Sequence, residues 1–160
     1  MSLDTDEFWM REALRAAEEA GRLNEIPIGA CLIDNEGSLL ASGGNRTRLL
    51  CDPTAHAEIL VLRAASRKIG NYRLTDATLY ATIEPCAMCA GALVQARVKR
   101  LVYAAADERF GAVETLFGIC DSDRLNHRLE ITSGVLADES RDLMQSFFRA
   151  RRLEKKPLAD

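Results

Sequence analysis

Two short motifs contain the residues of this sequence whose types and spacing best suit chemistry. His56 and Glu58 form an H-x-E motif, and Cys86 and Cys89 form a C-x-x-C motif that directly follows Pro85. One imidazole and two thiolates are three ligands that suit Zn²⁺ and leave the fourth tetrahedral position open. A water can occupy this fourth coordination position. The carboxylate of Glu58 then lies within reach of that water and can transfer the water's protons. Together the motifs predict a hydrolytic zinc site with His56, Cys86 and Cys89 as ligands.

A structural zinc site and a redox-active pair are the alternatives for these residues. Structural zinc sites usually have four protein ligands, and the candidates for a fourth are His127, Cys31, Cys51 and Cys120. A C-x-x-C pair alone is often redox-active, but a thioredoxin-like site does not account for His56 and Glu58. We therefore favour catalytic zinc and interpret the other three cysteines as packing or incidental thiols.

Apolar periodicity and turn signals predict the elements that must position the two motifs. The predicted order is a helix (4–21), a hairpin of two strands (26–33 and 38–43), a helix capped by Thr54 and ended by Gly70, a strand (78–83), a helix (86–96), two further strands (100–104 and 129–135) and a closing helix (138–153). Strands that alternate with helices indicate an α/β sheet covered on both faces. Both motifs then lie in the first turn of a helix, where the helix dipole favours thiolates.

Length and composition limit the class of protein. The chain has 160 residues, of which 48% are hydrophobic and 28% are charged. This balance fits one globular domain over residues 1–160 and excludes disordered, collagen-like and coiled-coil proteins. The formal net charge of −3 gives no global sign of a nucleic-acid binder, although a local patch can oppose the net charge.

The N-terminus and the cysteines indicate the compartment. Residues 1–7 are acidic and lack the basic and apolar regions of a secretory signal. No apolar run reaches the ~18 residues that a membrane span requires. The five cysteines are an odd number, which without a secretory signal indicates reduced thiols. We therefore expect a cytoplasmic protein without a membrane segment.

The closing helix has two features that suit RNA. The basic residues of the segment 141–156 are Arg141, Arg149, Arg151, Arg152, Lys155 and Lys156. All of these except Arg141 could neutralise phosphates, or they could be the solvated basic end that a helix dipole favours. The helix also has an apolar stripe of Leu143, Met144, Phe147 and Phe148. Because only about one of two adjacent phenylalanines can point inward, the other could stack on a base.

The two motifs resemble the signature of zinc-dependent nucleobase deaminases. Over about residues 7–153 the chain is similar to bacterial tRNA-specific adenosine deaminases in particular. The matching stretches are 44–46, 52–59, 71–74, 76–80, 84–92, 126–128 and 147–149. The chain departs from that family in the loops at 49–51 and 104–110, where Glu108, Arg109 and Phe110 are atypical. The resemblance implies an α/β fold, a three-layer αβα sandwich with a central mixed five-stranded sheet like that of cytidine deaminases.

The same resemblance implies hydrolytic deamination of adenosine to inosine at the wobble position of a tRNA anticodon. A zinc-bound hydroxide would attack C6 of the adenine, and Glu58 would carry protons to N1 and to the departing ammonia. Asn45 would hydrogen-bond the flipped-out nucleoside, although its local sequence fits a turn-forming asparagine equally well. Phe148, Arg149 and Arg152 would contact the anticodon stem-loop. The enzyme would be a homodimer in which each subunit completes the RNA site of the other.

Two other functions stay open on the sequence. A deaminase of a free base or nucleoside, such as guanine, cytosine or cytidine, would share the zinc site, but the basic closing helix and the extent of the resemblance favour the RNA enzyme. A noncatalytic, zinc-stabilised RNA-binding subunit would have no use for Glu58. The sequence does not decide the oligomeric state either, because the apolar run at 90–94 could face a second subunit or pack inside one.

Overall fold

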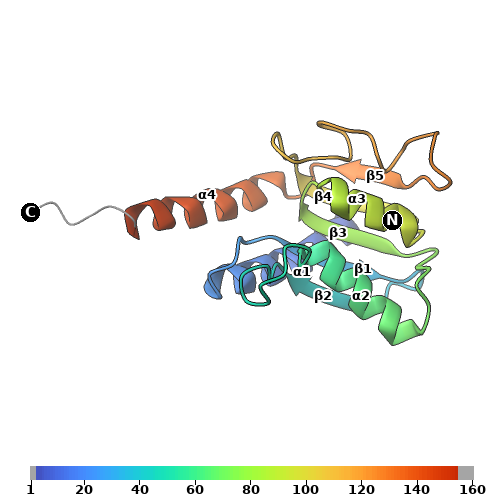
Figure 1. Cartoon of the computed structure of the whole chain (residues 1–160), viewed down its shortest axis with the longest axis horizontal. Coiled ribbons are helices and arrows are strands. Elements are labelled where there is room, and N and C mark those ends of the chain that lie inside the picture. Colours follow the sequence, from blue (N-terminus) through green and yellow to red (C-terminus); the bar gives the residue numbers. More distant parts are fainter. Residues whose placement is uncertain (1–2, 155–160) are drawn as a thin grey trace, which may run out of the picture.

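The computed structural model describes residues 3–154, which form a sheet with helices on both faces (Figure 1). In chain order the elements are α1 (Leu3–Arg22), β1 (Gly29–Ile33), β2 (Leu39–Gly44), α2 (Ala57–Ile69), β3 (Thr78–Ile83), α3 (Ala87–Gln95), β4 (Arg100–Ala105), β5 (Glu130–Ser133) and α4 (Ala137–Glu154). The five strands lie in the order β2-β1-β3-β4-β5. β1 is antiparallel to β2 and β3, whereas β3, β4 and β5 are parallel. The expected mixed five-stranded sheet is confirmed.

Alternate residues of the central strands enter two separate apolar layers, because successive side chains of a strand point to opposite faces. Leu32 and Leu79 pack in the layer that holds the apolar side chains of α2 and α3. Cys31 and Tyr80 pack on the other face, against α1. Both faces of β1 and β3 are therefore buried along their whole length. This arrangement confirms the expected three layers.

One edge of the sheet collects the ends of four strands. Gly29 at the start of β1 pairs with Gly44 at the end of β2, and the carboxyl ends of β3 and β4 meet where Ile83 pairs with Ala105. The parallel pair β3 and β4 needs a crossover connection, which α3 supplies. α3 begins directly after β3, so the P-C-x-x-C motif lies at this same edge.

The start of α2 differs from the sequence prediction. The helix begins at Ala57 with His56 in the N-cap position, not with Thr54 as its cap. Thr54 instead donates its hydroxyl to Asp52 Oδ1 at 2.7 Å, in a turn that precedes the helix. Gly70 ends the helix in the left-handed conformation, with φ at 68°, as predicted.

α4 extends beyond the sheet, as Figure 1 shows at the left of the molecule. Its first turns are anchored, because Ser140 is buried and donates its hydroxyl to the carbonyl oxygen of Thr82. The apolar stripe that follows is only partly buried, and Phe148 at its end is 39% exposed. None of the helices within residues 3–154 has the length and apolar character needed to cross a bilayer.

A buried ion pair fastens α1 to the sheet. Arg100 of β4 donates to both carboxylate oxygens of Asp6 at 2.8 Å and to Thr132 of β5, and the Tyr80 hydroxyl donates to Asp6 at 2.8 Å. Burial alone raises the pKa of Asp6, but the hydrogen bonds from Arg100 and Tyr80 outweigh it and lower the pKa overall. Asp6 is therefore ionised at neutral pH and joins α1 to β3 and β4, and Arg100 extends this network to β5.

Candidate active site

His56, Cys86 and Cys89 lie together at the crowded edge of the sheet. Nδ1 of His56 is 3.6 Å from Cys86 Sγ and 3.5 Å from Cys89 Sγ, and the three ligand atoms all lie within 4.8 Å of one another. Ligand atoms that bind a tetrahedral zinc ion at ~2.0–2.3 Å stand about 3.6 Å apart. The two distances from His56 Nδ1 match this spacing, and the three donor atoms are close enough together to share one such ion.

The residues considered as a fourth ligand lie away from the cluster of His56, Cys86 and Cys89. His127 Nε2 lies 2.7 Å from the carbonyl oxygen of Val98, and Cys120 is buried beside the carbonyl of Ala90. Cys31 is buried with its thiol 3.3 Å from the carbonyl oxygen of Trp9. Among residues 3–154, no other histidine, cysteine or carboxylate joins the cluster of three. The cluster therefore lacks the fourth protein ligand that is usual in a structural zinc site.

Two helix N-termini present the cluster. His56 is the N-cap residue of α2, Cys86 is the N-cap residue of α3, and Cys89 follows within the first turn of α3. The hydrogen bond from Cys89 lowers the pKa of the Cys86 thiol to about 4, with a further contribution from His56. The same hydrogen bond, together with burial, raises the pKa of Cys89. Cys86 is thus a thiolate at neutral pH, which is the form that binds metals.

Glu58 lies beside the cluster on the first turn of α2 and is buried. Burial is the main cause that raises the pKa of its carboxyl group. Its Oε2 atom is buried and has no hydrogen-bond partner within the part of the chain that the structure describes. A buried carboxylate oxygen without a partner costs free energy. Glu58 therefore fits a site in which a water or a substrate supplies the missing hydrogen bond.

A pocket of about 330 Å³ opens onto these residues, near the lower end of the roughly 300–1,000 Å³ of small-molecule sites. Its lining residues come from loops at the same sheet edge and from the starts of α2 and α3: Ile26, Ile28, Asn45, Thr47, His56, Glu58, Ile83, Glu84, Cys86, Asp107 and Phe110. Cys89 is fully buried behind this surface. The pocket therefore combines apolar walls with one thiolate, one imidazole and three carboxyl side chains, those of Glu58, Glu84 and Asp107.

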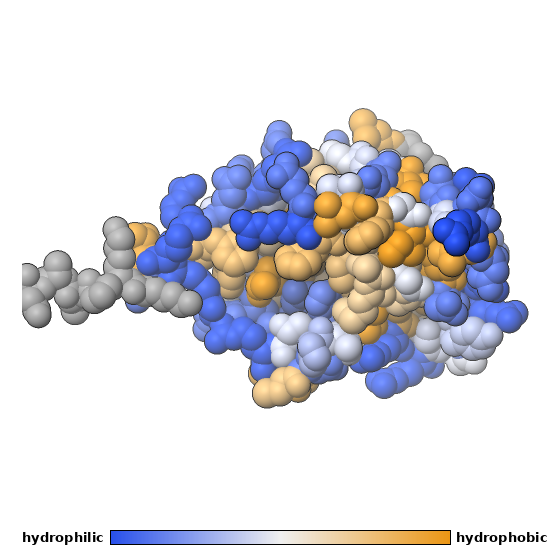
Figure 2. Space-filling model, turned by 45° about the horizontal axis from the view of Figure 1, so that its top comes forward, coloured by the Kyte–Doolittle hydropathy of each residue, from blue (hydrophilic) through white to orange (hydrophobic). Residues whose placement is uncertain are grey.

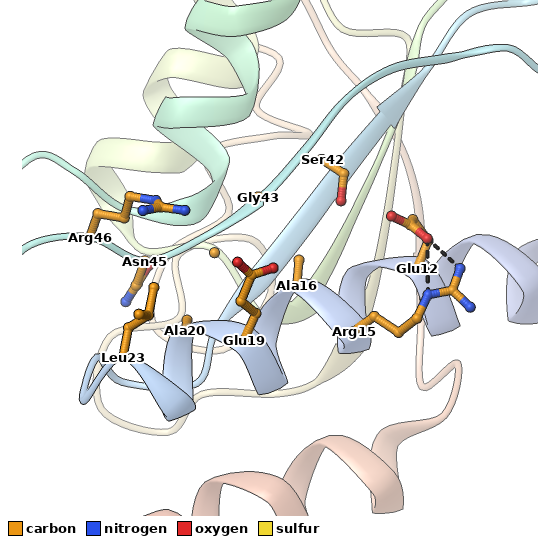
Figure 3. A pocket seen from close by; sticks show the side chains of 11 residues that line it. Glu12, Arg15, Ala16, Glu19, Ala20, Leu23, Ser42, Gly43, Asn45 and Arg46 are labelled. Atoms are coloured by element: carbon orange, nitrogen blue, oxygen red, sulfur yellow. Dashed lines mark hydrogen bonds and ion pairs between the residues drawn. The ribbon is translucent and has the colours of Figure 1, made fainter.

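A second hollow, of about 300 Å³, lies between α1 and β2 (Figure 3). Its charged side chains include Glu12 and Arg15, which pair with each other, and Glu19. Asn45 lies between the two hollows, but no histidine or cysteine lines this second one. The chemistry that the sequence predicts belongs to the first pocket.

Comparison with known proteins identifies the family. A family model described as MafB19-like deaminase matches residues 4–152. The tRNA-specific adenosine deaminase of Haemophilus influenzae is 49% identical over 151 residues, which are 94% of this chain and 87% of that relative. The chain belongs to the tRNA-specific adenosine deaminase family. The family member of Bacillus subtilis is 42% identical over 151 residues, covering 94% of this chain and 93% of that one.

Solved structures agree with the assignment of this chain to the deaminase family. A structure from a study of A-to-I editing by tRNA:A34 deaminases at the wobble position superposes with a TM-score of 0.82 and 44% identity, covering 85% of this chain and 98% of that one. The guanine deaminase of Nitrosomonas europaea superposes with a TM-score of 0.73 and 27% identity, covering 88% of this chain and 83% of that one. RNA-editing and free-base deaminases thus share this fold.

Asn45 makes a capping contact and also lies in the pocket wall. It follows β2 and is buried, and its side-chain Oδ1 accepts a hydrogen bond from the Ala57 N–H at 2.8 Å. It therefore caps the helix of this deaminase that begins next to His56, and its side chain also lines the pocket. Gly44 allows the close approach of α1 at this point, because a Cβ there would lie 2.6 Å from the carbonyl oxygen of Ala16.

The residues expected to contact RNA lie on α4 and do not line the pocket. Arg149 and Arg152 are exposed, and Phe148 is the more exposed of the two adjacent phenylalanines. Arg151 is engaged within the subunit, since its guanidinium lies 5.2 Å from the Phe147 ring centroid and donates to the Asn24 carbonyl at 3.3 Å. Figure 2 shows that the part of α4 that leaves the body is mostly hydrophilic. Lys155 and Lys156 lie outside the described residues.

Sequence reasoning gave no role to two carboxylates of this deaminase that shape the pocket. Glu25 is buried and accepts hydrogen bonds from the backbone N–H groups of Arg48 and Leu49, next to Thr47 of the lining. Glu84 is buried at the end of β3 and holds the loop on the opposite side. An acidic residue directly after an apolar strand is the signal that could have indicated Glu84.

Proposed function

We propose that this chain hydrolyses adenosine to inosine at the wobble position of a tRNA anticodon. The observation that carries the proposal is the convergence of His56, Glu58 and Cys86 on one pocket, in a chain 49% identical to a tRNA-specific adenosine deaminase. An unpaired anticodon base costs little to unstack, so it can enter a pocket that a paired base cannot reach.

The ion that we propose for the cluster is Zn²⁺, because one imidazole and two thiolates are a donor set that suits it. When bound, Zn²⁺ supplies a Lewis acid that lowers the pKa of a coordinated water. His56, Cys86 and Cys89 would hold the ion, and the partnerless Oε2 atom of Glu58 supports a reacting group beside this cluster.

The proton transfers are assigned to Glu58. Its Oε2 atom takes a proton from the attacking water and gives it to N1 of the adenine while the water oxygen bonds to C6. It then takes the second proton of that water and gives it to the amino nitrogen as the C6–N bond breaks. Ammonia leaves and inosine remains, so atoms and protons balance. Asn45 lines the same pocket, and its side-chain amide is the group assigned to hydrogen-bond the nucleoside.

An assay with an anticodon stem-loop that carries adenosine at the wobble position tests the function. We expect one inosine and one ammonia for each adenosine consumed, measured by nuclease digestion with chromatography and by an ammonia assay. Free guanine is the matched alternative substrate, because the Nitrosomonas europaea guanine deaminase has the same fold. Turnover of guanine without turnover of the stem-loop would contradict the proposal.

The exposed arginines of α4 give a prediction about affinity. The double change Arg149→Gln and Arg152→Gln should weaken stem-loop binding and flatten its salt dependence, by about 0.7–0.9 in the log–log slope for each phosphate that is no longer neutralised. Fluorescence anisotropy between 50 and 200 mM salt (about the range over which such phosphate binding is resolved) measures both. Arg67→Gln is the matched control, since Arg67 is exposed in the last turn of α2, in the layer on the other face of the sheet. An unchanged slope in the double variant would remove α4 from the RNA site.

We also propose a homodimer and a cytoplasmic location. The apolar run at 90–94 gives little support to the dimer, because Ala90, Leu93 and Val94 are buried in the core of the subunit. Met88 beside the metal ligands is 37% exposed and offers an apolar surface for a second copy. The cytoplasm follows from the proposed tRNA substrate, and it agrees with five cysteines that are all free thiols.

A further inference from the structure

The loop after β4 brings an aromatic ring to the rim of the pocket. Phe110 lines the same pocket as His56 and Glu58, yet 67% of its surface is exposed. An apolar ring of this size is costly to leave in water, and the described part of the chain does not bury it.

The backbone that carries Phe110 is held firmly. The Glu84 carboxylate accepts hydrogen bonds at 2.8–3.1 Å from backbone N–H groups on both sides of Phe110 in the sequence. The donors are Asp107 before it and Val113, Glu114 and Thr115 after it. Asp107 Oδ1 in turn accepts from the N–H groups of Arg109 and Phe110 at 2.9 and 3.2 Å.

Gly111 completes this support. It forms a bridge with Cys86, and a Cβ at this position would lie 2.3 Å from Glu84 Oε2. The loop is therefore packed closely against the metal-ligand motif. The backbone that carries Phe110 is therefore already ordered, so little backbone freedom is lost when a ligand binds.

From this placement, and resting on the proposed function, we propose that Phe110 stacks on the unpaired base next to the target adenosine and so contributes to recognition of the anticodon loop. The target base must reach Glu58 at the base of the pocket, whereas the exposed ring lies at the rim, where the neighbouring nucleotide passes. Stacking of single-stranded bases on aromatic side chains is a general mode of RNA recognition. It favours substrate and transition state equally, so it should act on KM and leave kcat unchanged.

The test uses the full chain and two matched phenylalanines. Phe110→Ala should raise KM for the stem-loop about tenfold with unchanged kcat, zinc content and salt slope, and Phe110→Tyr should restore KM. Phe117→Ala is the control, because Phe117 is similarly exposed at 59% but lines a different hollow, with Ile119 and Leu125.

A fluorescent base gives a readout that a purely structural role would not change. With 2-aminopurine in place of the base next to the target adenosine, binding to the unmodified protein and to Phe117→Ala should quench the emission, and binding to Phe110→Ala should not. An unchanged KM, or a quench that persists in Phe110→Ala, overturns the inference. If the unmodified protein does not deaminate the stem-loop at all, the proposed function fails instead, so the two failures are distinguishable.

Discussion

We expect Glu58→Gln to lower kcat for stem-loop deamination by about 10⁴-fold, the upper part of the range for general acid–base catalysis, because two proton transfers depend on this carboxylate. Glutamine has nearly the same shape but cannot take a proton from water at neutral pH. The measurement is single-turnover formation of inosine with enzyme in excess. Glu58→Ala should show the same loss, which would exclude an effect of the glutamine amide itself.

The same variant should keep its metal, its RNA affinity and its fold. Removing a buried charge whose Oε2 atom has no partner relieves a desolvation cost, so the free energy of unfolding in urea should not fall. Glu36→Gln is the matched control, since Glu36 is exposed in the β1–β2 turn. Turnover within tenfold of normal in Glu58→Gln would refute the assignment of the proton transfers.

Cys86→Ser and Cys89→Ser should each abolish both metal binding and activity. Purified protein should contain about one zinc per chain, and either serine variant should retain well below a tenth of that, because a hydroxyl is a far poorer zinc ligand than a thiolate. Mass-spectrometric metal analysis after exhaustive dialysis gives the ratio. Full zinc occupancy in Cys86→Ser would overturn the ligand assignment.

Two other cysteines of this chain serve as controls for the metal experiment. Cys51→Ser changes an exposed thiol and should alter neither zinc content nor stability. Cys120→Ser should also keep its zinc, but it places a hydroxyl in a buried site and should lower the free energy of unfolding by about 1–3 kcal/mol. Loss of zinc in Cys120→Ser without unfolding would show that the cluster extends beyond the three assigned residues.

The sequence predicted the elements well where local signals are strong. Apolar runs between turn residues located all five strands, and Gly70 marked the end of α2, because these patterns depend on neighbours along the chain. The grouping of His56 with Cys86 and Cys89 could also be predicted, since three metal-binding side chains in two compact motifs leave few other arrangements.

Features that depend on long-range hydrogen bonds were not predictable in the same way. Thr54 has the local preference for a helix cap, but Asn45 fulfils that function from the end of β2. The role of Glu84 depends on backbone N–H donors in a loop about thirty residues later in the sequence. The residues next to Glu84 do not predict that this loop will supply those hydrogen bonds. The stripe of α4 has helical periodicity, yet periodicity alone cannot show that the helix extends beyond the sheet that would bury it.

The position of the site at one edge of the sheet has a consequence for how such enzymes diverge. The proposed metal ligands lie at helix starts anchored by the buried sheet, whereas much of the pocket wall belongs to loops at the ends of β2, β3 and β4. Such loops can be lengthened or replaced while the layers beneath them stay intact. The guanine deaminase shares the fold at 27% identity. A change from a macromolecular to a small substrate therefore requires no new architecture. Exchanging the 106–115 segment between the two proteins is a compact way to alter which of these substrates is accepted.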